Sequence, residues 1–557
     1  MTELRKVAVF GLDGVTFDLL GPLMEEGHLP NLKRLIEAGA SGELTSTIPP
    51  VSASAWASMA TGTNPGQHGL IDFTYPRPNG YQIEVSNRTM RRMVALWDIV
   101  AQAGGKVGVV SVPMTFPPNT TSGYIVSSFM APSQSSPYTS PPELKSEIAR
   151  AIGEPFPLHM NEAKRTKDPA GFARELAGME TKRADAVLYL MGTKPWDFFM
   201  YVVESTDNLQ HEVWHILDPA HPRHDPAQAK ATRGIILDYY DQVDAKLGEM
   251  LDAVPDDALV IVLSDHGFGP FLNFFHVNNW LVKAGYLRIK RGGLSGLKYL
   301  LFRLGFTPLN LARLATQLGL SGLRKHVKRG RGQSMLRRLF LSFNDVDWAR
   351  TKAFSVGNFG QVYLNVKGRR PQGAIDPGDA YEALRDELIE AALALRDPKT
   401  GEKVIQAAYR SEEVFHGRAF ETMPDLILHT DRAKYVSFGH ADFGSGNIIE
   451  PSFGQTGHHH MQGIVVLRGP DVRAGAKLEG ATLLDVAPTV LYAMGLPVPH
   501  YMDGAVLEAA FESETLAARP IAFSDDDGDI SRTQTDIYSE EDEAEIMQRL
   551  RDLGYVG

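Results

Sequence analysis

The chain has 557 residues, a formal net charge of −11 and no cysteine. It therefore has no disulfide bonds, thiolate metal ligands or cysteine nucleophile, and any transition-metal site must use His, Asp, Glu or hydroxyl groups. No apolar run approaches the roughly 20 residues of a membrane span. The N-terminal residues lead into a short apolar strand that lacks the features of a signal peptide. The expected location is the cytoplasm.

Charge is distributed unevenly along the chain. Residues 281–340 contain fourteen Lys or Arg and no Asp or Glu, and apolar patches such as 299–302 lie between the basic residues. Basic amphipathic segments bind anionic membranes, so we expect this stretch to make peripheral membrane or lipid-headgroup contact. The alternative is a helical subdomain whose solvated face is basic. Such segregation favours a local anionic partner, and no nucleic-acid partner is predicted.

Predicted strands and helices alternate through much of the chain. The predicted strands are 7–12, 106–112, 198–203, 258–263 and 463–467. The predicted helices are 30–40, 90–103, 182–191, 232–251 and 484–494. This alternation predicts an α/β fold with a mostly parallel central sheet and helices on both faces.

The pattern changes after Gly269, where basic, leucine-rich sequence and short strands replace the alternation. We therefore expect a catalytic α/β core formed by residues 1–280 and 431–523. An inserted cap subdomain, residues 281–430, would interrupt this core, with its basic part at 281–340. Residues 524–557 are expected to form an acidic C-terminal tail that ends in a short helix at 543–553.

Metal-ligand residue types follow two predicted strands. Asp13 ends the first strand, and Asp265 and His266 follow the strand at 258–263. Open α/β sheets place their ligands at the carboxyl ends of their strands. Carboxylate oxygen and imidazole nitrogen together suit zinc or manganese. A capped turn is the alternative role at both positions.

Ser52 follows two prolines and opens a run of small residues that predicts a helix N-terminus. It could simply cap the helix. It could also be a nucleophile at the positive end of the helix, where an anion is favoured. A serine hydroxyl needs activation, and the sequence shows no neighbouring histidine, so a metal would have to supply it.

Two further clusters contain histidine. Asp207 and His211 are four residues apart, so on a helical turn they share one face and could bind one ion. His215 continues that face and is expected to pack. Three consecutive histidines occupy 458–460, and in an extended segment His459 points away from the other two. A histidine-rich loop favours metal binding over packing.

This ordered set of motifs resembles the alkaline phosphatase superfamily, in particular its type I phosphodiesterase/nucleotide pyrophosphatase branch and related phosphohydrolases and phosphomutases. The motifs are Gly-Leu-Asp-Gly at 11–14, Pro-Pro-Val-Ser at 49–52, Asp-x-x-x-His at 207–211, Ser-Asp-His-Gly at 264–267 and a late histidine before Gly463. The resemblance covers roughly residues 1–130, 195–280 and 440–510.

The resemblance implies two divalent ions, with zinc preferred and manganese the alternative. One ion would be held by Asp207, His211 and His459, with His458 as the second choice for the last ligand. The other would be held by Asp13, Asp265, His266 and the oxygen of Ser52. Ser52 would form a covalent phosphoserine, from which water would then release phosphate.

The chain departs from the family pattern at Phe73, where diesterases often carry a phosphate-binding asparagine. This argues against nucleotide-type recognition, and Asn358 in the insertion could replace the missing side chain. The segment after Ser52 lacks the proline and arginine of sulfatases. The sequence thus predicts a metal-dependent hydrolase of a phosphate ester, preferably a diester. The alternatives are a phosphomutase or phosphotransferase using the same site, and a non-catalytic protein that binds phosphate or lipid.

Overall fold

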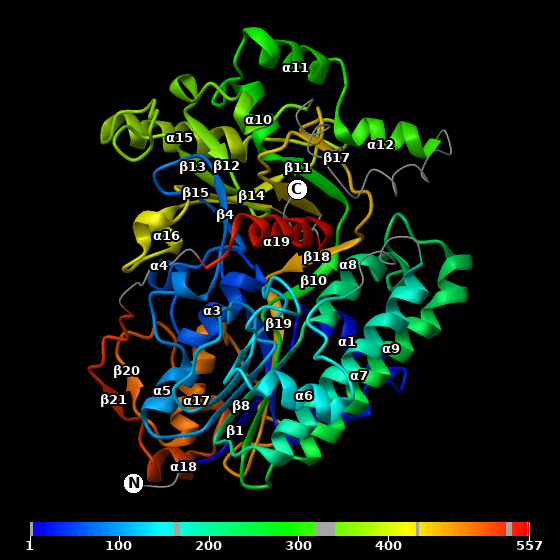
Figure 1. The fold of residues 1–557 in the computed structure, drawn as a ribbon, viewed down its shortest axis with the longest axis vertical. Helices are drawn as coiled ribbons and strands as arrows, with labels where there is room; N and C mark the ends of the chain where they lie inside the picture. Colours follow the sequence, from blue (N-terminus) through cyan, green and yellow to red (C-terminus); the bar gives the residue numbers. More distant parts are fainter. Residues whose placement is uncertain are drawn as a thin grey trace.

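The computed structural model describes residues 4–160, 168–317, 340–430, 434–530, 537–553 and 555. Its centre is an eight-stranded sheet with the order β2-β19-β9-β1-β8-β5-β6-β7 (Figure 1). The pairs β9–β1, β1–β8, β8–β5 and β5–β6 are parallel, whereas β2–β19, β19–β9 and β6–β7 are antiparallel. These strands are β1 (Val7–Leu12), β2 (Ala40–Thr45), β5 (Val107–Val110), β6 (Gly123–Val126), β7 (Thr139–Ser140), β8 (Phe198–Val203), β9 (Leu259–Leu263) and β19 (Gln462–Arg468). The predicted α/β class with a mostly parallel sheet is confirmed.

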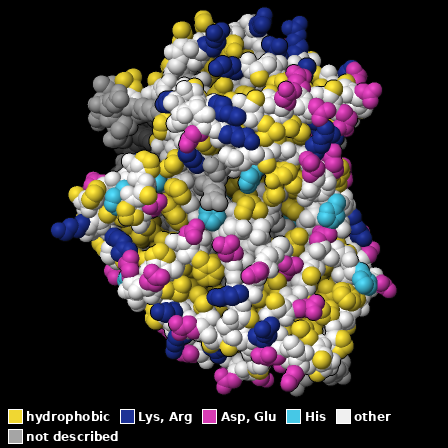
Figure 2. Space-filling model, turned by 180° about the vertical axis from the view of Figure 1, so that it is seen from behind, with side chains coloured by type: hydrophobic (Ala, Val, Ile, Leu, Met, Phe, Trp, Pro, Cys, Tyr) yellow, Lys and Arg dark blue, Asp and Glu magenta, His cyan; other side chains and the backbone are white. Residues whose placement is uncertain are grey.

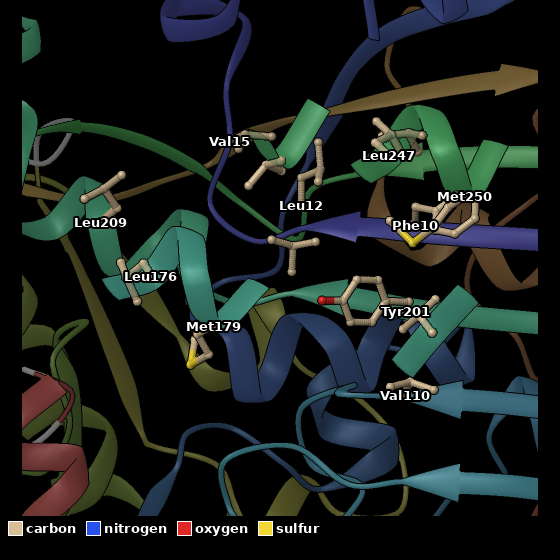
Figure 3. Packing of buried hydrophobic residues seen from close by; sticks show 14 of the residues in the cluster. Phe10, Leu12, Val15, Val110, Leu176, Met179, Tyr201, Leu209, Leu247 and Met250 are labelled. Atoms are coloured by element: carbon tan, nitrogen blue, oxygen red, sulfur yellow. The ribbon is translucent and has the colours of Figure 1, made fainter. Parts of the chain in front are cut away.

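Helices cover both faces of this sheet because its central strands are apolar on both sides. Side chains alternate along a strand, so Phe10 and Leu12 of β1 enter one hydrophobic cluster while Val7 and Val9 enter another. The first cluster packs against α1 (Phe17–Glu25), α2 (Pro30–Ala38), α7 (Pro169–Thr193), α8 (Ser205–Leu217) and α9 (Pro226–Asp252), as Figure 3 shows in part. The second packs against α3 (Ser52–Thr61), α5 (Leu96–Gln102) and α17 (Val486–Met494).

Two long helices begin earlier than their apolar periodicity predicts. The carboxylate of Asp168 accepts from the backbone N–H of Gly171 at 2.8 Å, so α7 begins at Pro169 and not near 182. Asp225 caps α9 in the same way, with Pro226 as the first helical residue. An aspartate followed by proline is a recognised helix start, and here it overrides the weaker periodicity of the first turns.

A third hydrophobic cluster joins residues between Phe275 and Phe443 and lies beside the main sheet (Figure 1). It contains the four-stranded antiparallel sheet β12-β13-β15-β14, and a three-stranded sheet, β16-β11-β17, adjoins it. The elements of this part are β10 (Gly267–Pro270), β11 (Asn273–His276), α10 (Val277–Ala284), α11 (Gly293–Arg303), α12 (Pro308–Gln317), β12 (Ala353–Ser355), β13 (Gln361–Leu364), α15 (Asp379–Leu393), β14 (Ile405–Arg410), α16 (Ser411–Val414), β15 (Leu426–Thr430), β16 (Tyr435–Phe438), β17 (Ile449–Pro451) and β18 (Gly457–His460).

The domain limits 1–280, 281–430, 431–523 and 524–557 stay predictions. Residues 318–339, a large part of the basic stretch, lie outside the described residues. The remaining elements are α4 (Pro65–His68), β3 (Thr74–Pro76), β4 (Ile83–Val85), α6 (Leu144–Ile152), β20 (Val498–Pro499), α18 (Ser513–Ala518), β21 (Phe523–Ser524) and α19 (Glu540–Leu553). Within the described ranges, no helix combines the length and apolar character needed to cross a membrane.

Candidate active site

The fold brings seven of the predicted site residues together at the carboxyl edge of the main sheet. Loops after β1 and β9, helix α8 after β8, the first turn of α3, and β18 each contribute. All seven side chains are buried, none exposing more than 4 % of its surface: Asp13, Ser52, Asp207, His211, Asp265, His266 and His459. Parallel pairing of β1 with its two neighbours sets three of these chain segments side by side, because equivalent strand ends then meet at one edge.

One group of ligand atoms contains two histidines. Asp207 Oδ1 lies 3.0 Å from His459 Nε2 and 3.4 Å from His211 Nε2. The two Nε2 atoms are 3.1 Å apart. Antiparallel pairing of β10 with β18 carries His459 to this position opposite Phe268. With this spacing the three side chains could bind one ion together.

The second group surrounds Ser52. Its Oγ lies 3.2 Å from His266 Nε2 and 3.5 Å from Asp13 Oδ1. His266 Nε2 is also 3.4 Å from Asp265 Oδ2. Ser52 is the first residue of α3, and Val51 is the N-cap. The sequence around Ser52 shows no histidine, but the fold brings His266 to it across 214 positions, and the family resemblance had placed these two residues on one ion.

Asp207 stands between the two groups. One of its carboxylate oxygens also lies within 4.8 Å of a ligand atom of Asp13 and of His266, as one does for His211 and His459. The resemblance placed this carboxylate in the first group alone. The two candidate metal positions are therefore adjacent, and Asp207 borders both of them.

All three histidines are held in the same orientation by backbone carbonyl groups. His211 Nδ1 lies 2.8 Å from Gly457 O, His266 Nδ1 lies 3.0 Å from Gly267 O, and His459 Nδ1 lies 3.0 Å from Pro50 O. A carbonyl oxygen can only accept, so each Nδ1 carries a proton and each Nε2 is turned toward the site, where it could bind a metal ion. Histidines that bind metals are oriented in this way.

Burial and the charges of neighbouring groups shift the pKa values of the acidic side chains in the site. Burial, together with the charges of Asp265 and Asp207, raises the pKa of Asp13 well above its ordinary value. Burial likewise raises the pKa of Asp265 to about 7. Although burial acts against it, the charges of His211 and His459 hold the pKa of Asp207 well below its ordinary value. Burial lowers the pKa of His266, so this histidine is neutral.

The residues present fit divalent metal ions. Asp207 Oδ1 and Asp265 Oδ2 are buried acceptors that no donor reaches within the described part of the chain. Buried polar atoms normally have a partner, and here both oxygens face histidine Nε2 atoms across 3.0–3.4 Å. A cation would satisfy the oxygen and nitrogen atoms together and would balance the crowded carboxylates. Which residues hold which ion remains a proposal.

Three further residues, which the sequence did not indicate, support the site. The Trp56 indole N–H donates to Asp13 Oδ2 at 2.9 Å, and the Tyr555 hydroxyl donates to Asp207 Oδ2 at 2.8 Å. Asn208, beside Asp207, lines a small cavity next to Ser52. Trp56 could have been found, since it lies one helical turn after Ser52 on the same face. Nothing in the sequence connects Tyr555 with the other motifs.

The remaining predicted residues, Asn358, His458 and His215, are buried and belong to neither ligand group found in the described part of the chain. Asn358 is buried, its Oδ1 lies 2.8 Å from His440 Nε2, and it lines a cavity of about 1270 Å³ that reaches His459. His458 belongs to neither ligand group among the described residues, and its Nδ1 accepts from the backbone N–H of His459. His215 packs against Thr456, as expected, with Nδ1 3.1 Å from Oγ1.

A mostly parallel sheet whose strand ends carry paired Asp/His groups around a serine defines an alkaline-phosphatase-like enzyme. Residues 7–447 match the family described as type I phosphodiesterase / nucleotide pyrophosphatase. The chain belongs to this family and is a phosphohydrolase of the alkaline phosphatase superfamily. No curated protein matches it.

Solved structures share the fold at low sequence identity. Phosphonoacetate hydrolase from Sinorhizobium meliloti 1021, in complex with phosphonoacetate, has a TM-score of 0.52 and 14 % identity, covering 88 % of this chain and 95 % of its own. Murine ectonucleotide pyrophosphatase / phosphodiesterase 5, inactive and in complex with AMP, has a TM-score of 0.47 and 12 % identity with the same coverage. At such identities the first comparison establishes the fold alone.

Proposed function

We propose that this protein hydrolyses a phosphate ester, preferably a diester, through a covalent phosphoserine at Ser52 and with two divalent ions. One observation carries the proposal. The Ser52 hydroxyl lies at the N-terminus of a ten-residue helix, within 3.5 Å of Asp13 and His266, in a buried set of metal-ligand side chains. A serine in this position has both an electrostatic setting and a ligand environment that suit phosphoryl transfer.

Asp207, His211 and His459 would hold one ion, and Asp13, Asp265, His266 and Ser52 the other. Zinc is preferred because imidazole nitrogen and carboxylate oxygen suit it, and manganese is the alternative. Bound there, the ions would lower the pKa of the Ser52 hydroxyl and balance charge on the phosphoryl group.

The chain's own residues would act as follows. Ser52 Oγ forms a bond to phosphorus as the ester P–O bond breaks, and the departing alcohol gains the proton that the serine loses. The partial positive charge at the start of α3 favours the negative charge on the phosphoryl group. A water then attacks phosphorus, the Oγ–P bond breaks, and Ser52 regains its proton. The three histidines keep their Nδ1 protons on backbone carbonyl groups throughout.

The environment of Phe73 bears on the substrate. Its side chain is fully buried, with ring centroids 5.5 Å from Phe129 and 4.8 Å from Tyr555. An aromatic side chain therefore occupies the position that the family resemblance assigns to a phosphate-binding asparagine. This supports an ester other than a nucleotide-type diester, with Asn358 as the candidate substrate-binding amide.

The test is ester turnover combined with metal analysis. Bis- and mono-nitrophenyl phosphate would be assayed with zinc or manganese for the wild type, Ser52→Ala and Asp265→Ala. Ser54→Ala is the matched control, because this serine is buried in the same helix and its Oγ makes no hydrogen bond. Diesterase activity lost only in the first two variants supports the proposal. Transfer of phosphoryl to an added alcohol would favour a phosphotransferase, and metal binding without turnover would favour a binding protein.

We also propose that the cap contacts an anionic membrane surface through α11 and α12. Several large apolar side chains there are exposed, among them Leu294 (64 %), Leu300 (55 %) and Leu304 (75 %). Basic side chains lie near them. Figure 2 shows Lys and Arg beside hydrophobic groups at the upper end of the molecule, where Figure 1 places α11. Exposed leucine beside basic charge is the pattern of an interfacial helix.

Liposome sedimentation tests this contact. We expect binding to vesicles that contain anionic lipid at low salt, and weaker binding for Leu300→Glu. Equal sedimentation without anionic lipid, or none at low salt, would contradict it. The cytoplasmic location, peripheral to the membrane, remains a prediction from the sequence.

A further inference from the structure

The C-terminal segment, residues 537–555, is anchored across the core. The Tyr538 ring stacks on Phe116 with centroids 5.7 Å apart, and its hydroxyl donates to Met130 O at 3.2 Å. The guanidinium of Arg549 in α19 donates to the carbonyl oxygens of Phe129 at 2.8 Å, Ala131 at 3.1 Å and Pro132 at 2.8 Å. Figure 1 shows α19 between the main sheet and the cap elements. These contacts fix the segment beside the loop that follows β6.

The segment ends inside the candidate active site. The Tyr555 side chain is buried, and its ring packs on Phe73 with centroids 4.8 Å apart. Its hydroxyl donates to Asp207 Oδ2 at 2.8 Å, across 348 residues of sequence. A carboxylate can only accept, so the direction of this hydrogen bond is fixed.

The two oxygens of Asp207 have different partners. Oδ1 faces the Nε2 atoms of His211 and His459, whereas Oδ2 accepts from the Tyr555 hydroxyl. The phenol therefore holds the carboxylate so that Oδ1 points at the two histidines. Hydrogen bonds of this kind fix the orientation of metal ligands, and removing one typically weakens metal affinity or activity about 10–100-fold.

Tyr555 also borders two spaces. It lines the cavity of about 20 Å³ that touches Ser52, together with Leu553 and Arg549. It also lines a groove of about 650 Å³, together with Asn358 and Met547. The smaller space has room for about one water molecule. The C-terminal segment thus forms part of the boundary of the site. Through Tyr555 it contacts Asp207 and lines the cavity beside Ser52.

We propose that the C-terminal segment completes the metal site, with Tyr555 as a positioning residue that orients Asp207. This rests on the proposed function in one respect, that Asp207 binds a metal ion. It adds a contribution from a part of the chain that the sequence motifs do not include.

The test uses the full-length protein and zinc alone. Zinc affinity would be measured by competition with a chromophoric chelator for the wild type and for Tyr555→Phe, which removes only the hydroxyl. Tyr538→Phe is the matched control, because it removes a hydroxyl from the same segment at a distance from the ligands. We expect Tyr555→Phe to weaken one of two zinc sites about 10–100-fold and the control to stay within about twofold. Circular dichroism and thermal unfolding would show that both variants fold.

A second readout separates positioning from a general structural role. In an ester assay, the zinc concentration for half-maximal activity should rise in Tyr555→Phe, while the rate at saturating zinc stays near that of the wild type. Wild-type zinc affinity at both sites in Tyr555→Phe, or an equal loss in Tyr538→Phe, would overturn the inference. A wild type that binds two zinc ions without hydrolysing any ester would contradict the proposed function and leave the zinc result decisive for Tyr555.

Discussion

The two halves of the candidate site differ in how far the protein balances their charge by itself. In the half that contains His459, two histidines surround Asp207 and hold its pKa well below the ordinary value. In the half that contains Ser52, burial raises the pKa values of Asp13 and Asp265, and one neutral histidine accompanies them. The Ser52 half therefore depends more on an added cation, because its carboxyl groups lie close together without a positive charge beside them.

The largest expected effect comes from the Ser52 half. Ser52→Ala should reduce ester hydrolysis by roughly a thousand-fold or more, because the nucleophile is lost. Zinc bound in the His459 half should be unaffected. Steady-state kinetics and metal analysis on the same preparation check both statements. If Ser52→Ala retained more than about a tenth of the wild-type activity, Ser52 would not be the nucleophile.

The next largest effect is expected from substitutions that remove one ion and leave the other bound. Asp265→Asn should lose the ion of the Ser52 half and keep the other, whereas His459→Ala should do the reverse, each with at least roughly a hundred-fold loss of activity. Metal content per chain, measured after gel filtration, distinguishes the two outcomes. If either substitution removed both ions together, the two halves would form one cooperative site, which would contradict independent binding of the two ions.

A smaller effect is expected at Trp56, which supports the Ser52 half. Trp56→Phe removes the indole N–H that donates to Asp13 Oδ2 and leaves a buried carboxylate oxygen without this donor. We expect a loss of about 1–3 kcal/mol in the free energy of unfolding of the metal-free protein. Added zinc should reduce the loss. Trp97→Phe, also buried but distant in the chain, controls for the change in ring size.

The smallest effect on activity is expected at Asp72, a buried carboxyl outside both ligand groups. Burial raises its pKa to about 7. An aspartate in the unfolded chain has a pKa of about 3.9, so the stability that Asp72 contributes is full below about pH 4 and is lost as the pH rises from there through about 7. Asp72→Asn stays neutral, so between pH 5 and 8 its stability should fall less than that of the wild type, by about 2 kcal/mol. Parallel stability curves from urea unfolding would show that Asp72 is ionised in the folded state throughout.

Local sequence pattern was sufficient to predict the α/β class, and it marked candidate ligand residues that the family resemblance then grouped into two sets. Each of these is a short-range signal: an apolar strand followed by Asp13 or by Asp265 and His266, and a helical spacing between Asp207 and His211. Starts of long helices were predicted less well, because the capping residues Asp168 and Asp225 precede turns with weak periodicity. The assignment of each ligand to an ion remains a proposal.

The sequence by itself therefore determined the elements of this protein and the chemistry available at their ends. The tertiary structure decided which of those groups meet. Parallel pairing of β1, β8 and β9 sets Asp13, Asp207 and Asp265 side by side, and the β10–β18 pair brings His459 to them. It also places Ser52 beside His266 and the Tyr555 hydroxyl on Asp207. Contacts between residues hundreds of positions apart depend on packing of the whole chain, which no local pattern encodes.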